Sequence, residues 1–281
     1  MTDLPALVFV DAPPIPETFN VLLYGQPKSG KSTAAATAPG PILWLNAEGP
    51  GALGFARKTA AERGTAIHEV RIDKSTDVAQ TLRQVFTHVR DGHDPKPRTV
   101  VVDTIGKVRD ALVAQLVVPG SKNTLQQFGQ VADQLGGFVQ AMRDLPVNLV
   151  ILAHADVRDS DEDGRIVMPL IGGKLTETIP GEVDVVAFTS ALRVDDEPRP
   201  RYFGQLIESR GRIAGDRSGA LAGERGIREL DLSEWLGAYR RALAPDTSDL
   251  PWSGSGPEGP DAEAQVEGDG QAQQQTLEEA A

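Results

Sequence analysis

The sequence of 281 residues predicts an α/β protein with a doubly wound, mainly parallel β-sheet. Two observations support this prediction. Short, continuous apolar runs recur along the chain, and such runs are typical of strands covered by helices on both faces. Stretches with apolar residues at helical spacing lie between the runs, and this alternation is expected of strand–helix–strand units. The length is sufficient for one large domain.

Four apolar runs predict the parallel strands, and each of them is short and lacks alternation. They are FNVLLYG (19–25), PILWLN (41–46), RTVVVD (98–103) and VNLVILAH (147–154). The helices expected between them cover 32–38, 76–90 and 125–145.

The C-terminal part of the predicted domain adds a small β extension. The runs EVDVVAFTSALRV (182–194) and RYFGQLIES (201–209) are joined by the polar turn DDEPRP, which predicts an antiparallel pair. The amphipathic stretch LSEWLGAYRRAL (232–243) predicts a final helix with Ser233 as its N-cap.

The two ends of the chain differ in composition from the predicted domain at 19–243. Residues 1–18 form a lead that contains Pro13, Pro14 and Pro16, and residues 244–281 are rich in Pro, Gly, Ser, Gln and acid. Nine carboxylates and no Lys or Arg follow Arg241, so the net charge of −12 becomes −3 without them. We therefore expect a disordered acidic tail and a nearly neutral domain, on which a local basic face is still possible.

Composition also excludes several classes of site. The chain has no cysteine, which excludes disulfides, thiolate metal sites and cysteine nucleophiles. No apolar run reaches membrane-spanning length, and the first residues lack the features of a signal peptide. We expect a cytoplasmic protein with no membrane partner.

The stretch GQPKSGKS (25–32) matches the phosphate-loop motif G-x-x-x-x-G-K-[ST] in full, between a predicted strand and a predicted helix. Its backbone N–H groups and the helix N-terminus suit phosphates, Lys31 would neutralise the β- and γ-phosphates, and Ser32 would bind Mg²⁺. The alternative is a chance Gly/Ser turn with a surface lysine. The nucleotide-binding residues predicted from the motif are Gly25, Gln26, Pro27, Lys28, Ser29, Gly30, Lys31, Ser32 and Thr33.

Two acidic residues end apolar runs near this motif. Asp103 ends RTVVVD and is expected to hold the Mg²⁺, although a strand-end aspartate can also cap a turn. Many ATPases place a catalytic glutamate directly after this aspartate, but here the next residue is Thr104. Glu48, at the end of ILWLNAE, is the candidate for the missing base, and Gly49 and Gly51 would let the chain leave sharply. The alternative is that Glu48 caps the next helix.

Together with the long stretch GSKNTLQQFGQVADQLGGFVQAMRDLPVNLVILAH, these motifs resemble the ATPase core of the RecA-like recombinases over about 20–218. The compact RecA-like proteins of bacteriophages, which assist single-strand annealing, are the most similar members. The resemblance implies ATP and Mg²⁺ as cofactors, with Lys31, Ser32 and Asp103 on phosphate and metal. It also implies Glu48 as the base, His154 as a γ-phosphate sensor, and a cytoplasmic location in a bacterial host.

The resemblance further implies contacts with DNA and with a neighbouring subunit. DNA would meet two loops, at 117–124 and 156–174, with Gly172 and Gly173 as the hinge of the second. Basic residues after the second late strand would reach the neighbour's γ-phosphate, with Arg210, Arg212 and Arg217 as the candidates. A core histidine and a solvated basic loop are the plain alternatives for His154 and for the arginines. The DNA-binding residues implied are Lys122, Arg158, Arg165 and Lys174.

The function expected from these features is a DNA-dependent ATPase that assembles with itself, as a filament or ring, on single-stranded DNA and promotes annealing or strand exchange. The acidic tail would recruit a single-strand-binding or replication protein, or only aid solubility. One alternative is a nucleotide-switched interaction module. Another is a helicase-like replication ATPase without recombinase activity.

Overall fold

The computed structural model describes residues 17–73, 75–160, 164–194, 197, 200–223 and 226–244. Contacts divide the chain into Met1–Pro245 and Asp246–Ala281, and the second unit lies outside the described residues. Residues 1–16 of the expected lead and residues 245–281 of the expected acidic tail also lie outside the described residues.

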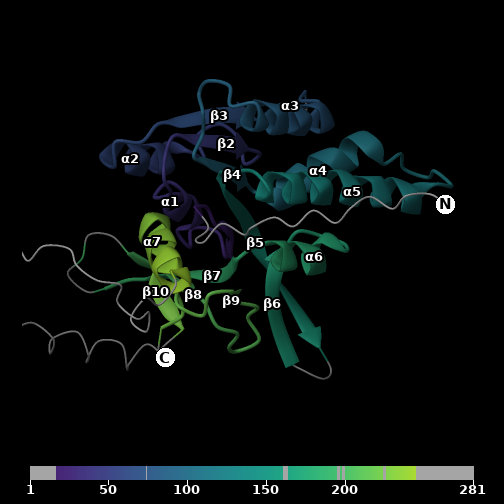
Figure 1. The fold of residues 1–281 in the computed structure, drawn as a ribbon. Helices are drawn as coiled ribbons and strands as arrows, with labels where there is room; N and C mark the ends of the chain where they lie inside the picture. Colours follow the sequence, from purple (N-terminus) through teal and green to yellow (C-terminus); the bar gives the residue numbers. More distant parts are fainter. Residues whose placement is uncertain are drawn as a thin grey trace, which may run out of the picture. The chain divides into compact units, whose positions relative to one another are not determined.

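A single sheet organises the first unit, and its strands run in the order β10-β8-β7-β1-β5-β4-β2-β3 (Figure 1). The pairs from β3 to β7 along this order are parallel, whereas β8 and β10 pair antiparallel. The short β9 pairs with β7, and β6 pairs with β5. The strands are β1 (Asn20–Gly25), β2 (Ile42–Asn46), β3 (Ile67–Arg71), β4 (Thr99–Asp103), β5 (Asn148–Ser160), β6 (Gly164–Leu170), β7 (Val185–Leu192), β8 (Arg201–Gln205), β9 (Gly215–Asp216) and β10 (Ile227–Glu229).

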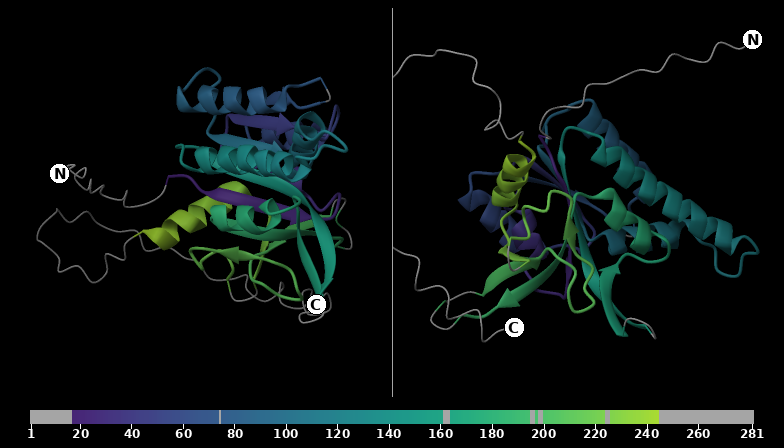
Figure 2. Two further views of the ribbon diagram at one scale, coloured as in Figure 1. Left: turned by 90° about the vertical axis from the view of Figure 1, so that its right-hand side faces the viewer. Right: turned by 60° about the horizontal axis from the view of Figure 1, so that its bottom comes forward.

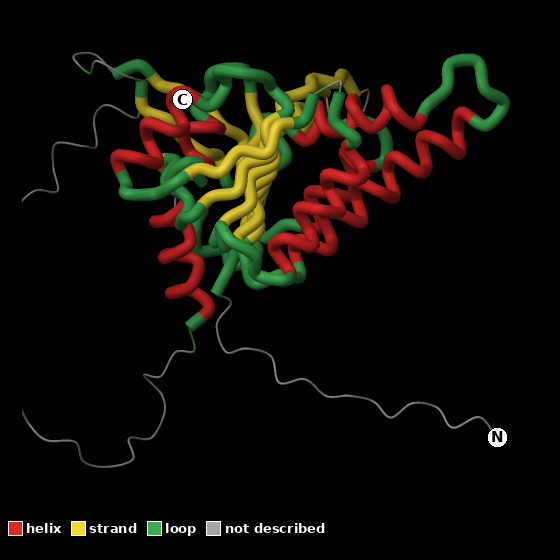
Figure 3. Tube along the Cα trace, turned by 90° about the horizontal axis from the view of Figure 1, so that it is seen from above, coloured by secondary structure: helices red, strands yellow, loops and turns green. Residues whose placement is uncertain are grey.

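Helices cover both faces of this sheet (Figures 2 and 3). Successive side chains of β1 point to opposite faces, so Leu22 and Tyr24 pack with α3–α6 while Val21 and Leu23 pack with α1, α2 and α7. Burial on both faces explains why the central strands are continuously apolar. The helices are α1 (Lys31–Ala35), α2 (Gly54–Glu62), α3 (Val78–Arg90), α4 (Ile105–Leu116), α5 (Thr124–Arg143), α6 (Leu175–Glu182) and α7 (Leu232–Leu243).

The predicted fold class is confirmed, and the four expected parallel strands are β1, β2, β4 and β5. The two later runs form the expected antiparallel pair, β7 and β8, in which Phe188 lies opposite Gln205. The expectation that the fourth strand ends at His154 is wrong, because β5 continues to Ser160. After His154, β5 leaves its parallel neighbours and pairs only with β6.

Several elements escaped the sequence analysis. The edge strand β3 is only half-buried and lacks a strong apolar run. Helix α6 contains Pro180, which argues against a helix because proline lacks the N–H and clashes with the preceding turn. The predicted N-cap Ser233 is also wrong. Asp231 caps α7 by accepting from the backbone N–H groups of Ser233 and Glu234, while the Ser233 hydroxyl donates to the Thr37 carbonyl.

No helix in the described part of the chain is both long and apolar enough to cross a membrane.

Two leucines of α5 provide a test of the packing of this helix. Leu135 is fully buried against the sheet, whereas Leu125 is 88% exposed. Replacing Leu135 with Ala should lower the free energy of unfolding by about 2–5 kcal/mol, because a cavity remains in the core. The matched control Leu125→Ala should change it by less than about 0.5 kcal/mol. Urea unfolding followed by circular dichroism measures both, and equal effects would contradict the described packing.

Candidate nucleotide and catalytic site

The parallel register brings the ends of several strands together at one edge of the sheet. Gly25, the last residue of β1, lies opposite His154 of β5 and Thr189 of β7. Asp103, the last residue of β4, lies opposite Asn46, the last residue of β2. The predicted site residues from these strands therefore share the carboxyl edge of the sheet, where open α/β sheets bind ligands.

The phosphate loop links β1 to α1 and requires glycine at both ends. At Gly30 the backbone φ of 90° lies in the left-handed region, and a Cβ there would lie 2.4 Å from the ring of Tyr202. At Gly25 a Cβ would lie 2.4 Å from the Thr189 hydroxyl, which itself lies 2.6 Å from the Ser29 hydroxyl. Tyr202 of β8 and Thr189 of β7 thus support the loop, although no local motif marked either residue.

Lys31 lies folded into the loop that precedes it. Its ammonium group donates to the carbonyls of Gly25 and Gln26, at 2.9 and 2.8 Å. The residue is only 6% exposed, and this burial lowers the pKa of its side chain to about 8, although the charges of Asp103 and Glu48 oppose the shift. The residue predicted to bind phosphate therefore lies at the loop and in a poorly hydrated place, where an anionic ligand would interact strongly with its charge.

Ser32 and Asp103 lie together, as a shared metal site requires. The Ser32 hydroxyl donates to Asp103 Oδ2 at 3.1 Å. Burial raises the pKa of Asp103 to about 6, and the nearby charge of Glu48 adds to the rise. Mg²⁺ prefers oxygen ligands and is usually held by one or two protein groups together with phosphates and waters. The hydroxyl and the carboxylate fit that ion, and a bound cation would favour the charged form of Asp103.

Glu48 follows β2 in a turn that is organised by Asn46. The Asn46 side-chain oxygen accepts from the backbone N–H groups of Glu48 and Gly49, at 3.0 and 3.3 Å. The Asn46 amide group donates to the Gly49 carbonyl and to Glu69 of β3. Gly49 has a φ of 104°, as expected for a sharp exit. Glu48 does not cap the next helix, because the N-cap of α2 is Leu53 and no side chain bonds there.

The Glu48 carboxylate is held by two side chains from other strands. Its Oε1 accepts a hydrogen bond of 2.7 Å from the Thr104 hydroxyl, and it lies 3.3 Å from Nε2 of His154. The other ring nitrogen of His154, Nδ1, is buried and has no partner among the described residues. Glu48 and His154 thus lie side by side, as expected of residues at a common site, and Thr104 lies beside them. The sequence analysis noted Thr104 only as a position without glutamate.

The candidate arginines after β8 differ in their surroundings. Arg212 donates to the Gln205 side chain at 3.1 Å, and its guanidinium lies 4.6 Å from the centre of the Phe188 ring. Arg217 donates to the Gly181 carbonyl at 2.7 Å and pairs with Asp184. Arg210 is exposed at a turn with a φ of 54°. Arg212 and Arg217 therefore contact groups of their own chain.

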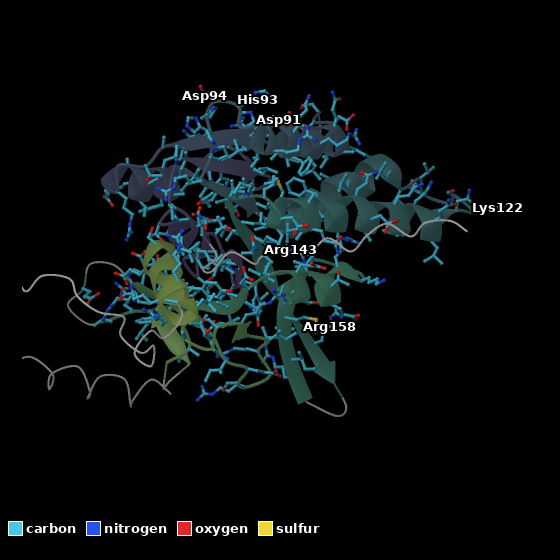
Figure 4. The ribbon with its side chains drawn as sticks, in the orientation of Figure 1. Asp91, His93, Asp94, Lys122, Arg143 and Arg158 are labelled. Carbon is cyan, nitrogen blue, oxygen red and sulfur yellow. The ribbon has the colours of Figure 1, made fainter. Side chains whose placement is uncertain are left out.

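The four residues expected to contact DNA lie on different segments of the fold. Lys122 lies in the connection between α4 and α5, at the outer end of these helices, while Arg158 lies on β5 (Figure 4). Arg165 lies on β6, and Lys174 is the N-cap of α6.

The expectation of a second loop at 156–174 is wrong, because an antiparallel ribbon, formed by β6 and the end of β5, occupies most of it. In this pairing Ser160 lies opposite Gly164, and residues 161–163 between them lie outside the described residues. Arg158 pairs with Asp156 at 3.1 Å, so its charge is partly neutralised. The expected hinge glycines, Gly172 and Gly173, follow β6 and both have positive φ values.

Comparisons with known proteins identify the family. Residues 17–218 match the family described as AAA domain. No curated protein matches the sequence. Among solved structures, a KaiC-like protein from the hyperthermophilic archaeon Pyrococcus horikoshii is similar, with 15% identity, a TM-score of 0.37, and coverage of 68% of this chain and 79% of that chain. Because the family match spans most of the chain and contains the whole phosphate loop, the chain belongs to the AAA domain family and is a P-loop ATPase.

Proposed function

We propose that this protein hydrolyses ATP with Glu48 as the general base, and that single-stranded DNA stimulates the reaction. The position of the Glu48 carboxylate carries the first part of the proposal. It lies at the edge of the sheet that also holds the phosphate loop and Asp103, and two hydrogen-bond donors fix one of its oxygens. A base must be held within reach of the water whose proton it removes, and this arrangement suits that role.

The chemistry follows from the groups at this edge. Lys31 would exchange its contacts with Gly25 and Gln26 for the β- and γ-phosphates. Ser32 and Asp103 would hold Mg²⁺, which neutralises charge on the phosphate oxygens. A water oxygen attacks the γ-phosphorus, the bond to the β–γ bridging oxygen breaks, and the proton of the water passes to Glu48. His154 lies beside Gly25 in the sheet register, a suitable position for sensing the γ-phosphate.

Stimulation by DNA is proposed from the resemblance to RecA-like recombinases and from the connection between α4 and α5. Lys122 is the only charged residue between 117 and 131 in the sequence. Phe128 is partly exposed on the first turns of α5, where it could stack on a base. Assembly of several copies on the DNA, as a filament or ring, would bring one of the arginines after β8 to the ATP of a neighbouring copy. Annealing or strand exchange, as in the compact phage proteins, would then be the outcome.

A second candidate function is a nucleotide-switched interaction module. The ribbon formed by β6 and the end of β5 favours it, because the sequence from 156 to 165 carries five carboxylates and only two arginines. A segment of such acidic composition repels phosphates and suits a basic protein partner. In this function ATP would control binding of a replication or single-strand-binding protein, with a contribution from the acidic tail. A helicase-like replication ATPase is the remaining alternative, and its test is strand unwinding.

Replacing Glu48 with Gln should separate the two functions. The change keeps the shape of the side chain and removes the base, so we expect kcat for ATP to fall by at least about a hundredfold while ATP still binds. Turnover is measured by phosphate release and binding by a fluorescent ATP analogue. The control Glu62→Gln, on the exposed face of α2, should leave both unchanged. Turnover by Glu48→Gln equal to that of the native protein would exclude Glu48 as the base.

The lowered pKa of Lys31 predicts how ATP affinity depends on pH. In the nucleotide-free protein this pKa is about 8, and bound phosphates favour the charged ammonium group. ATP binding above pH 8 must therefore take up a proton, and affinity should fall roughly tenfold between pH 7 and pH 9. Titration with a fluorescent ATP analogue measures this. Lys31→Ala should bind weakly and lose this pH dependence, whereas an equal slope in both proteins would assign it to another group.

The proposed role of DNA is tested by ATP turnover with and without single-stranded DNA. Turnover should rise several-fold, and DNA binding should weaken as salt increases, because phosphate contacts release counterions. Lys122→Ala should reduce the stimulation without changing turnover in the absence of DNA. The matched control is Lys58→Ala, an exposed lysine on α2. If DNA leaves the native rate unchanged while Glu48→Gln abolishes it, the protein hydrolyses ATP with Glu48 as the base but is not stimulated by DNA.

A further inference from the structure

Thr104 lies directly before helix α4, but its side chain does not cap the helix. It occupies the N-cap position with an extended backbone, φ −107° and ψ 153°, yet its side chain makes no cap hydrogen bond. Threonine at an N-cap usually accepts from a backbone N–H of the first turn, which stabilises the helix by about 1 kcal/mol. Elsewhere in the chain Asp77 and Asp231 cap α3 and α7 in this way. The hydroxyl of Thr104 is therefore used for something other than its ordinary local role.

The Thr104 hydroxyl donates to the Glu48 carboxylate instead. The two residues are 56 positions apart, the bond to Oε1 is 2.7 Å long, and Thr104 is only 2% exposed. A bond from a hydroxyl to a carboxylate is stronger than one between neutral groups, and shielding from water strengthens it further. This contact crosses from β4 to the turn after β2, so it ties the end of the metal-binding strand to the proposed base.

The contact makes the two oxygens of Glu48 different. Oε1 faces Thr104 and His154, at 2.7 and 3.3 Å. Oε2 accepts no hydrogen bond from any residue that the structure describes. An oxygen that already has two close donors is a poor proton acceptor, so Oε2 is the atom available to water.

We propose that Thr104 is a positioning residue that fixes Glu48 with Oε2 directed toward the attacking water. This inference rests on the proposed role of Glu48 as the base. It also gives a reason for the hydroxyl after Asp103, where many ATPases place their glutamate. In this chain Glu48, in the turn after β2, provides the carboxylate. Thr104, directly after β4, provides the hydroxyl that orients it. Without the hydroxyl the Glu48 side chain gains rotamer freedom, and fewer of its conformations have the geometry for proton transfer.

The test measures ATP turnover by the native protein and by variants of Thr104, with a variant of Thr99 as the control. Thr104→Val replaces the hydroxyl with a methyl group of similar size, and kcat should fall roughly tenfold or more while KM for ATP changes less than about twofold. Thr104→Ser keeps the hydroxyl and should recover most of the loss. The matched control is Thr99→Val at the other end of β4, where the buried hydroxyl donates to the Pro39 carbonyl. Thr99→Val should lower thermal stability and leave kcat unchanged. Thr104→Ala serves as a second variant if Thr104→Val does not fold.

A double substitution tests whether Thr104 acts through Glu48. Adding Thr104→Val to Glu48→Gln should cause no further loss of turnover, because the orienting bond has no base to orient. A full tenfold further loss would overturn the inference. So would a native kcat in Thr104→Val, or a Thr104→Ser variant as slow as Thr104→Val. These results leave the proposed function intact if Glu48→Gln alone abolishes turnover. Native turnover in Glu48→Gln would instead overturn the proposed function itself.

Discussion

The register of the parallel strands is the constraint on which the site depends. Gly25 lies opposite both His154 and Thr189, and Asp103 lies opposite Asn46. A shift of one residue in any of these pairs would turn the side chains to the other face of the sheet. The two apolar clusters that cover β1 prevent such a shift, because Leu22 and Leu23 belong to opposite faces. The packing of the core thus determines which polar side chains meet at the edge.

The sequence was sufficient to predict the central strands and the phosphate loop, because both have signals within a few residues. Continuous apolar runs marked β1, β2, β4 and β5, and the motif marked Lys31 and Ser32. Glu48 could be singled out only by an indirect argument, from the missing glutamate after Asp103. Its neighbours Thr104 and His154 come from the start of α4 and from β5, and no local pattern shows that their side chains meet one carboxylate.

Other features were out of reach because they depend on tertiary contacts. Tyr202 covers Gly30 from the far side of β7, and only the fold shows this contact. The length of β5 was underestimated because its last residues are polar and partly exposed, and they are stabilised as a strand by β6 rather than by burial. The N-cap of α7 was predicted wrongly because Asp231 and Ser233 both suit the position. In the structure Asp231 caps the helix, and the Ser233 hydroxyl donates to the Thr37 carbonyl instead.

Burial makes the charged forms of the residues at the site less favourable, and a charged ligand would offset this effect. Lys31, Asp103 and Glu48 influence one another through a poorly hydrated space, and burial shifts the first two toward their neutral forms. A nucleotide with its metal brings both signs of charge, so it suits the ammonium group and the carboxylates together. A bound nucleotide with its metal would therefore favour the charged forms of Lys31 and Asp103.

The unbroken run of β5 has a mechanical consequence. The same strand passes through the core at Leu149, reaches the catalytic edge at His154, and continues to Ser160 as one arm of the ribbon. Extended, hydrogen-bonded strands are stiff, and this one has no loop or glycine between the edge and the arm. The ribbon therefore continues without interruption from the backbone of His154, whose imidazole lies 3.3 Å from the Glu48 carboxylate.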